Sequence, residues 1–434
     1  MKTVVSHAGK LILVFAVTFC ILLALLVGSA MIPRQNIHEH MLESAEFMVE
    51  RPVAYLVLDF ARSSKIDYYA DCITLSIANY FDEKHPLESA MWAHYYGDNS
   101  NVMNEYLLES VQNDLAPNQE YLRYWHGSAA LMRILHLFWN IRTIYIFHII
   151  LFVILIGAIV WLLIKNGYKG EAIAFIISLI IVAVWFVPLC LEYTYTFLCM
   201  LIAAFIGTWL ATNEKNNLIV PFFLVTGMTT AFFDFLTTET LTLLVPLLFI
   251  CRIQDAKKTD SNLWAECLKC CIVWGIGYLG MWVLKWITAS IVLKIDVMPY
   301  VTDHVAERIN GIVVSYPLTG NMYTDALVKN LRSLFPFEYG ICGAALVMVF
   351  VFIVILPVLT GKVILRNNIN KSNVFLYAAL GLVPYIRYLV LCNHSFVHFF
   401  FTYRAQAASI LAICLVIFEL VEPQKAGLRT EGMH

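Results

Sequence analysis

The sequence is poor in charge. Only 14% of its 434 residues are Asp, Glu, Lys or Arg, whereas 60% are hydrophobic, and the mean hydropathy is +0.73. In soluble domains, about a quarter of the residues are charged. This composition therefore argues against a soluble protein and predicts an all-α polytopic membrane protein. The net charge is −2, and no cluster of Lys or Arg indicates a nucleic-acid partner.

Cysteine is scarce in the long polar stretch, the part of the chain that a disulfide could stabilise outside the membrane. The 11 cysteines are scattered, and only Cys72 falls in the long polar stretch near the N-terminus, which argues against an ectodomain held by disulfides. Cys267, Cys270 and Cys271 are close together but have no partner His or Cys pair, so packing is favoured over a zinc site. The sequence also lacks the inverted repeats typical of secondary transporters, which argues against transport.

Apolar runs of about 20 residues, the length that crosses a bilayer, dominate the chain. They predict about ten transmembrane helices, at 11–31, 143–164, 172–190, 195–212, 218–233, 238–252, 265–293, 338–361, 373–392 and 398–421. The pair around 218–252 is short, which suggests a break or a re-entrant turn near Asp234.

The spans divide the chain into five parts. They are the first transmembrane helix (1–31), a large extracytoplasmic first loop with amphipathic helices (32–142), transmembrane helices two to seven (143–293), a second extracytoplasmic loop (294–337), and transmembrane helices eight to ten with a cytoplasmic tail (338–434). A large first loop is typical of an enzyme that works at a membrane surface.

Orientation follows from the Lys and Arg residues of the short loops, which collect on the cytoplasmic side. If ten spans alternate, all of these residues fall on one side. They are Lys2, Lys10, Lys165, Lys169, Lys215, Arg252, Lys257, Lys258, Lys362, Arg366, Lys371, Lys425 and Arg429. Both termini are therefore predicted to be cytoplasmic. Low cysteine use in the loop and the lack of targeting tails favour a bacterial plasma membrane.

Ionisable residues within the apolar segments share one depth, near the outer ends of their spans. They are Asp234, Glu239, Lys285, Arg387 and Arg404, with His394 and His398 beside the last turn. Charges in a membrane are costly and usually functional. Cations at the outer headgroups suit an anionic lipid phosphate. The alternative is that these residues snorkel or pair with one another, Asp234 with Lys285 for example.

The first loop carries two further motifs. Segment 37–60 has the period of an interfacial helix, and Asp67 and Asp71 follow it, on one helix face if that segment is helical. Repulsion between them would raise the pKa of one carboxyl, which suits a general base. Later, Tyr124-Trp125-His126-Gly127 precedes an amphipathic helix. Its alternative interpretation is an aromatic belt at the membrane interface.

This order of parts resembles the GT-C superfamily of membrane glycosyltransferases, in the branch of protein O-mannosyltransferases and aminoarabinose transferases. There, an Asp-Glu pair precedes an alanine-containing helix, and a Lys-Pro-Pro-Leu motif precedes an amphipathic helix, a Gly/Asn turn and an Arg. Here Asp71, with Ala78 beyond it, takes the acidic position, residues 124–127 replace Lys-Pro-Pro-Leu, and Asn140 and Arg142 match the turn. Cys72 stands where the Glu would be, so the chain would be a divergent member.

The resemblance implies a glycosyltransferase that moves a sugar, with inversion, from a polyprenyl-phosphate donor to an extracytoplasmic acceptor. That acceptor would be a cell-surface glycan, a lipid-linked glycan or a protein. One carboxylate suffices as general base, and Asp71 is the first candidate, with Asp67 second. The residues expected to stabilise the departing phosphate are His126, Arg123, Lys285, Arg387 and Arg404. The residues expected to contact substrate are Tyr124, Trp125, Asp234, Thr237, His394 and His398.

No metal is required when cations stabilise the leaving group, although Asp234, Glu239 and the histidine pair leave room for a divalent ion. Three other functions compete. A polysaccharide polymerase or ligase would use a lipid-diphosphate donor, but its large loop usually comes late in the chain. A flippase for lipid-linked glycans would need a polar path through both leaflets. A membrane acyltransferase would use an intramembrane histidine, for which His148 is the candidate.

Overall fold

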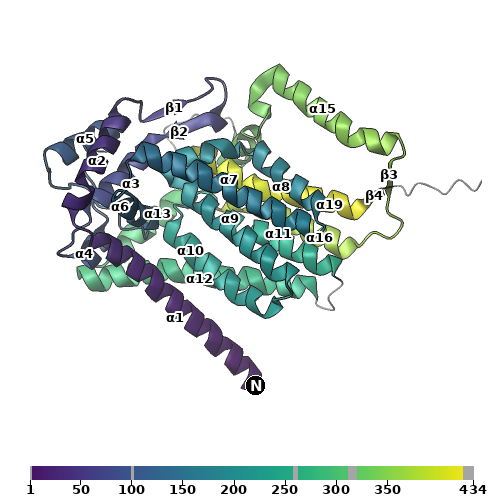
Figure 1. The fold of residues 1–434 in the computed structure, drawn as a ribbon, viewed down its shortest axis with the longest axis horizontal. Helices are drawn as coiled ribbons and strands as arrows, with labels where there is room; N and C mark the ends of the chain where they lie inside the picture. Colours follow the sequence, from purple (N-terminus) through teal and green to yellow (C-terminus); the bar gives the residue numbers. More distant parts are fainter. Residues whose placement is uncertain (1, 99–101, 258–261, 311–319, 424–434) are drawn as a thin grey trace, which may run out of the picture.

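The computed structural model describes residues 2–98, 102–257, 262–310 and 320–423. These residues form a nearly all-α molecule with two small two-stranded sheets (Figure 1), which confirms the predicted helical class. Parts of the predicted second loop and tail, with Lys258, Lys425 and Arg429, lie outside the described residues.

The first helix, α1 (Lys2–Ala30), leads into a loop module, residues 32–140, of short helices. Its elements are α2 (Arg34–Val49), β1 (Ala54–Leu56), η1 (Arg62–Ser64), β2 (Lys65–Asp67), α3 (Tyr68–Tyr80), α4 (Pro86–Trp92), α5 (Met103–Gln112) and α6 (Gly127–Leu135). β1 pairs antiparallel with β2, with Ala54 opposite Asp67. The predicted interfacial helix therefore ends at Val49, and the chain after it turns into a strand.

Apolar helices form the bundle beneath this module. They are α7 (Ile141–Lys165), α8 (Lys169–Ile181), η2 (Val184–Leu189), α9 (Leu191–Thr212), η3 (Asn216–Leu218), α10 (Ile219–Phe233), α11 (Thr240–Ala256) and α12 (Leu263–Leu293). The C-terminal part adds α13 (Met298–Asn310), α14 (Met322–Arg332), η4 (Phe337–Tyr339), α15 (Gly340–Leu359), β3 (Val363–Leu365), α16 (Lys371–Val390), α17 (Cys392–Val397), α18 (Phe399–Thr402), η5 (Tyr403–Ala405), α19 (Gln406–Leu420) and β4 (Val421–Pro423). In Figure 1, α15 stands to one side of the bundle.

Seven helices of the described part are long and apolar enough to cross a membrane, or up to eight if one bent pair is a single span. Three of the ten predicted spans are therefore not matched by a continuous helix of this kind. The segment 172–190 breaks after α8, where Ala183 has a φ of 51°. α11 has only 17 residues. α15 passes only as part of the bent pair, whose two helices meet at 77°.

The helix ends opposite the loop module carry the basic residues. Arg252 at the end of α11 forms ion pairs with Glu171 at the start of α8 (2.7 Å) and Glu419 at the end of α19 (2.6 Å). Lys257 donates to the carbonyl of Thr212 at the end of α9 (2.7 Å). The turns predicted to face the cytoplasm thus meet at one end of the bundle.

The closest helix packing in the bundle joins α10 and α12 through two glycines. A Cβ placed on Gly227 would lie 2.2 Å from the carbonyl oxygen of Trp274, and one on Gly277 would lie 2.5 Å from that of Leu224. Small residues allow helix backbones to approach this closely in membranes. The pair therefore fixes α12 against the rest of the bundle.

Gly227→Leu is expected to destabilise the protein by about 1–3 kcal/mol or more, because the new side chain forces the two backbones apart. Thermal unfolding in detergent, followed by tryptophan fluorescence, measures this effect. Gly157→Leu is the matched control, because a Cβ at Gly157 meets nothing within 4 Å. Equal stability of the two variants would show that the close approach of α10 and α12 is not maintained.

Candidate active site

A cavity of about 510 Å³ lies where the loop module meets the ends of the bundle helices. Segments far apart in the sequence supply its walls: the start of α3, residues 119–126, the first turn of α9, α13 and α17. Six of the residues singled out from the sequence line it, namely Asp67, Arg123, Tyr124, His126, His394 and His398. Folding therefore brings together about half of the predicted site residues.

Asp67 lines the cavity from the N-terminus of α3, where it is the N-cap residue. Its carboxylate forms an ion pair with Lys65, whose Nζ lies 2.7 Å from Oδ2. The same ammonium lies over the ring of Phe400, 3.7 Å from its centroid. These contacts fix the carboxylate at the cavity wall. Glu192, in the first turn of α9, and Glu120 line the same cavity, so three carboxylates belong to its lining.

Asp71, the first candidate for the base, does not line this cavity and is fully buried. Its carboxyl accepts hydrogen bonds from the Tyr145 hydroxyl (2.5 Å) and from the backbone N–H of Leu191 (2.8 Å). Burial raises the pKa of Asp71 well above its usual value, although both hydrogen bonds act in the opposite direction. Asp71 thus joins α3 to α7 and α9. Asp67 is the N-cap residue and lines the cavity, whereas Asp71 lies within α3 and is buried, so the two carboxyl groups have different surroundings.

The cavity lining also contains basic residues. The Arg123 guanidinium donates to Nδ1 of His304 (2.7 Å). Arg308 on α13 donates to Nδ1 of His394 (3.2 Å) and lies 3.5 Å from Nε2 of His398. Within the described ranges, neither arginine has a carboxylate within ion-pair distance, although Arg252 and Arg387 have such partners. The cavity therefore holds two guanidinium groups that have no direct ion pair with a carboxylate of the described residues.

The cavity histidines are neutral near pH 7. Burial lowers the pKa of His398 to about 3, and the charge of Arg308 adds to this effect. Burial, together with His398 and Arg308, also holds the pKa of His394 well below its usual value. Burial and then the Lys285 charge lower the pKa of His126 to about 3, and its Nε2 lies 2.8 Å from the carbonyl of Tyr121. These rings act as hydrogen-bonding groups and not as cations.

A narrow apolar groove of about 180 Å³ adjoins the cavity between α12 and α13. Its apolar lining comprises Leu236, Tyr278, Leu279, Trp282, Trp286, Val301, Val305 and Leu391. Leu279 is 63% exposed and Val305 is 48% exposed. Arg123, Tyr124, His304 and Arg308 line both the groove and the cavity, so the two arginines stand at the junction of an apolar and a polar space.

Three of the predicted phosphate-binding cations do not line the cavity. The buried Lys285 donates to the Met91 carbonyl at the end of α4 (3.0 Å). Arg404 donates to the carbonyls of Ser63 (2.9 Å) and Phe400 (2.8 Å). Arg387 forms an ion pair with Glu239, with Nε and Oε1 2.8 Å apart, and also donates to the Leu236 carbonyl. All three hold neighbouring segments together.

The remaining predicted substrate contacts also lie behind the cavity walls. Asp234 accepts hydrogen bonds from the hydroxyls of Thr237 (2.6 Å) and Thr196 (2.8 Å), which closes the turn between α10 and α11. Burial and the charge of Glu239 raise the pKa of Asp234 to about 6. The ion pair suggested between Asp234 and Lys285 is wrong, because Lys285 donates its hydrogen bonds to backbone carbonyls instead. Trp125 is buried and donates to the Met281 carbonyl (2.8 Å).

Sequence reasoning missed Glu192, His304 and Arg308. His304, Glu307 and Arg308 lie three and four residues apart on α13, within a segment that the sequence describes only as a second loop. Their spacing on one helix was the available signal. For Glu192, the available signal was its position just before the predicted span 195–212, where a carboxylate would lie at the end of a membrane helix.

Among the described residues, no group of three or more His, Cys, Asp and Glu side chains is arranged to hold a metal ion. Comparison of the chain with models of known families, with curated proteins and with solved structures finds no match.

Proposed function

We propose that this chain is a membrane glycosyltransferase that moves a sugar from a polyprenyl-phosphate donor to an extracytoplasmic acceptor. The observation that carries the proposal is the junction of cavity and groove, where no carboxylate of the described residues lies within ion-pair distance of Arg123 or Arg308. A ligand that matches this arrangement has an apolar chain, an anionic group and a polyhydroxylated head, in that order.

The anionic group is a phosphate held by the two guanidinium groups. Arginine presents paired N–H donors that match phosphate oxygens. The prenyl chain lies along the groove, against Trp282 and Trp286 of α12. The sugar then occupies the cavity, where Tyr124, His126, His394 and His398 offer rings and hydrogen-bonding atoms.

In the transfer step, an acceptor hydroxyl oxygen forms a bond to the anomeric carbon as the bond from that carbon to the phosphate oxygen breaks. Asp67 takes the hydroxyl proton as general base, and Lys65 holds it in position. The leaving group is the polyprenyl phosphate, whose additional negative charge is stabilised by Arg123 and Arg308. Attack from the side opposite the leaving phosphate inverts the anomeric configuration.

The proposed orientation places the cavity outside the cell. The basic helix ends then face the cytoplasm, as the distribution of Lys and Arg requires. Under this arrangement the chain is a multi-pass plasma-membrane protein with both termini inside. The groove meets the outer leaflet, where a polyprenyl-phosphate sugar presents its head to the exterior.

The test is transfer of radiolabelled sugar in proteoliposomes that contain the purified chain and a synthetic polyprenyl-phosphate donor. Arg308→Gln is expected to reduce transfer roughly 100-fold, because it removes a cation from the developing phosphate charge. Arg332→Gln, an exposed arginine on α14, is the matched control and should retain full activity.

Two outcomes would contradict the proposal. Consumption of diphosphate-linked donors alone would assign the chain to the polymerase or ligase class. Movement of labelled donor across the bilayer without any transfer would favour a flippase.

A further inference from the structure

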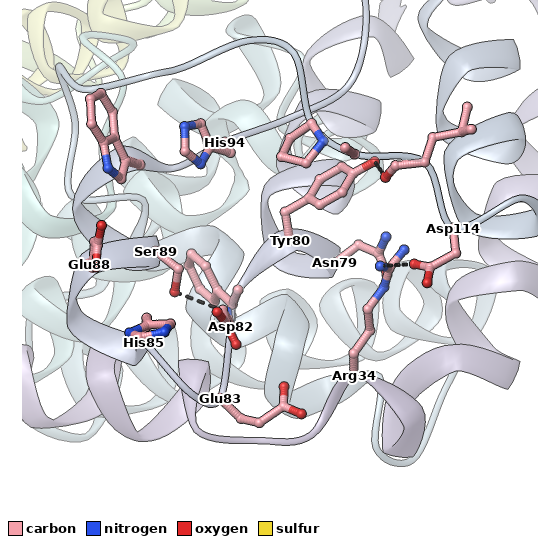
Figure 2. A pocket seen from close by; sticks show the side chains of 15 residues that line it. Arg34, Asn79, Tyr80, Asp82, Glu83, His85, Glu88, Ser89, His94 and Asp114 are labelled. Atoms are coloured by element: carbon pink, nitrogen blue, oxygen red, sulfur yellow. Dashed lines mark hydrogen bonds and ion pairs between the residues drawn. The ribbon is translucent and has the colours of Figure 1, made fainter.

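A second hollow lies on the loop module (Figure 2). It shares no lining residue with the candidate active site. This cleft has a volume of about 750 Å³ and lies between the start of α2, the end of α3, α4 and residues 114–117. Neither the transfer step nor the donor groove uses any of its side chains. Its charge differs from that of the cavity, since the one arginine in its lining is paired with Asp114, whereas no carboxylate in the described residues lies within ion-pair distance of Arg123 or Arg308 in the cavity.

The aromatic lining of the cleft includes a pair of nearly parallel rings, beside Tyr80 and Phe81. Trp92 and His94 stack with ring centroids 5.2 Å apart and an angle of 12° between the planes. Ala93 between them has a φ of 49°, a conformation that L-residues adopt only where the surrounding structure holds them. This backbone places alternate side chains on one side. A flat aromatic surface suits the C–H face of a sugar ring, because the π face is negative and the sugar hydrogens are positive.

The polar part of the cleft is acidic. Arg34 forms an ion pair with Asp114 and donates to Oδ1 of Asn79 (3.2 Å), so its charge is already neutralised (Figure 2). Glu83 and Glu88 are exposed and form no ion pair within the described part of the chain. Carboxylates accept hydrogen bonds from hydroxyl groups, but they repel phosphates and acidic sugars. The cleft therefore disfavours anionic ligands and offers acceptors to the hydroxyl groups of a polyhydroxylated ligand.

The cleft is connected to the candidate active site by a short pair of antiparallel segments. The Trp92 carbonyl accepts a hydrogen bond from the Tyr121 N–H (3.1 Å), and the Tyr95 N–H donates to the Gln119 carbonyl (3.1 Å). Trp92 lines the cleft, whereas Tyr95, Gln119 and Tyr121 line the cavity. The cleft and the cavity therefore lie beside the same pair of backbone segments.

We propose that the cleft binds a neutral glycan, the chain whose terminal hydroxyl receives the transferred sugar. This inference rests on the proposed function, and it identifies the acceptor as an oligosaccharide without acidic groups. The non-reacting sugars stack on Trp92 and His94, and their hydroxyls donate to Glu83 and Glu88.

Binding of the labelled full chain, in detergent, to an array of neutral and acidic glycans tests this proposal. A set of neutral glycans is expected to bind, and Trp92→Ala should weaken that binding about tenfold, as is typical when an aromatic contact at the centre of a site is removed. Trp139→Ala removes a 36% exposed tryptophan outside the cleft and should leave binding unchanged. In the transfer assay, Trp92→Ala should raise KM for long acceptors and leave kcat unchanged.

A double change of Glu83→Lys and Glu88→Lys keeps the test valid if Trp92→Ala fails to fold, because both positions are exposed. It should move the preference from neutral to acidic glycans. The inference is overturned if no neutral glycan binds, if acidic glycans bind best, or if neither variant changes binding. The array contains no donor, so glycan binding without sugar transfer would contradict the proposed function while supporting the cleft.

Discussion

Asp67→Asn is expected to reduce sugar transfer by about 10²–10⁴-fold, because an amide does not accept the proton of the attacking hydroxyl. Donor binding should persist, since Asp67 makes no ion pair with Arg123 or Arg308 and pairs with Lys65 instead. Two measurements separate these effects: the rate of transfer in proteoliposomes, and the retention of a fluorescent polyprenyl phosphate by the purified variant. Asn keeps the shape of the N-cap residue of α3, so the fold should be retained.

Asp71→Asn and Glu192→Gln are the matched controls for this assignment. Asp71 is buried against Tyr145 and Leu191, so its replacement should act on stability and leave folded protein active. Glu192→Gln should have a smaller effect than Asp67→Asn. If Asp71→Asn abolishes transfer at unchanged melting temperature while Asp67→Asn remains active, the base is Asp71.

The second large effect concerns stability. Glu239→Gln is expected to destabilise the protein by about 3–5 kcal/mol, because it leaves the buried guanidinium of Arg387 without its counter-charge. Both side chains of this pair are only 7% exposed. Unfolding in detergent with increasing denaturant measures the change in free energy.

The double variant Glu239→Gln, Arg387→Met should recover much of the lost stability, since neither charge is then buried alone. Glu266→Gln breaks an exposed pair with Lys269 and is the control, with an expected change of about 0–1 kcal/mol. If Glu239→Gln were as mild as this control, water would have to reach the Arg387 guanidinium. Arg387 would then again be a candidate for binding the donor phosphate, as the sequence predicts.

Local pattern predicts much of the fold. The apolar runs predict the long helices, and the polar turn at Asn140 predicts the start of α7, where the Asn140 side chain accepts from the Thr143 N–H (3.1 Å). The number of spans could not be predicted in the same way. The break after α8 depends on Ala183 in a left-handed conformation, and alanine carries no signal for such a break.

The candidate site could be predicted only in part, because residue type does not reveal the surroundings of a side chain. Lys285 and Arg308 are both cations near apolar segments. Lys285 donates a hydrogen bond to the Met91 carbonyl at the end of α4, whereas Arg308 lines the cavity. The distinction arises from α13 packing against α17, where the Asn393 side chain donates to the Glu307 carbonyl (2.7 Å). No local sequence feature encodes this long-range contact.

The groove between α12 and α13 opens among exposed apolar side chains such as Leu279 and Val305. A donor that enters there arrives by lateral diffusion within the leaflet and never crosses bulk water. The encounter is therefore two-dimensional, and its frequency depends on the number of donor molecules per unit of membrane area. Dilution of vesicles at constant composition leaves this surface density unchanged, whereas inert lipid added to the same bilayer lowers it.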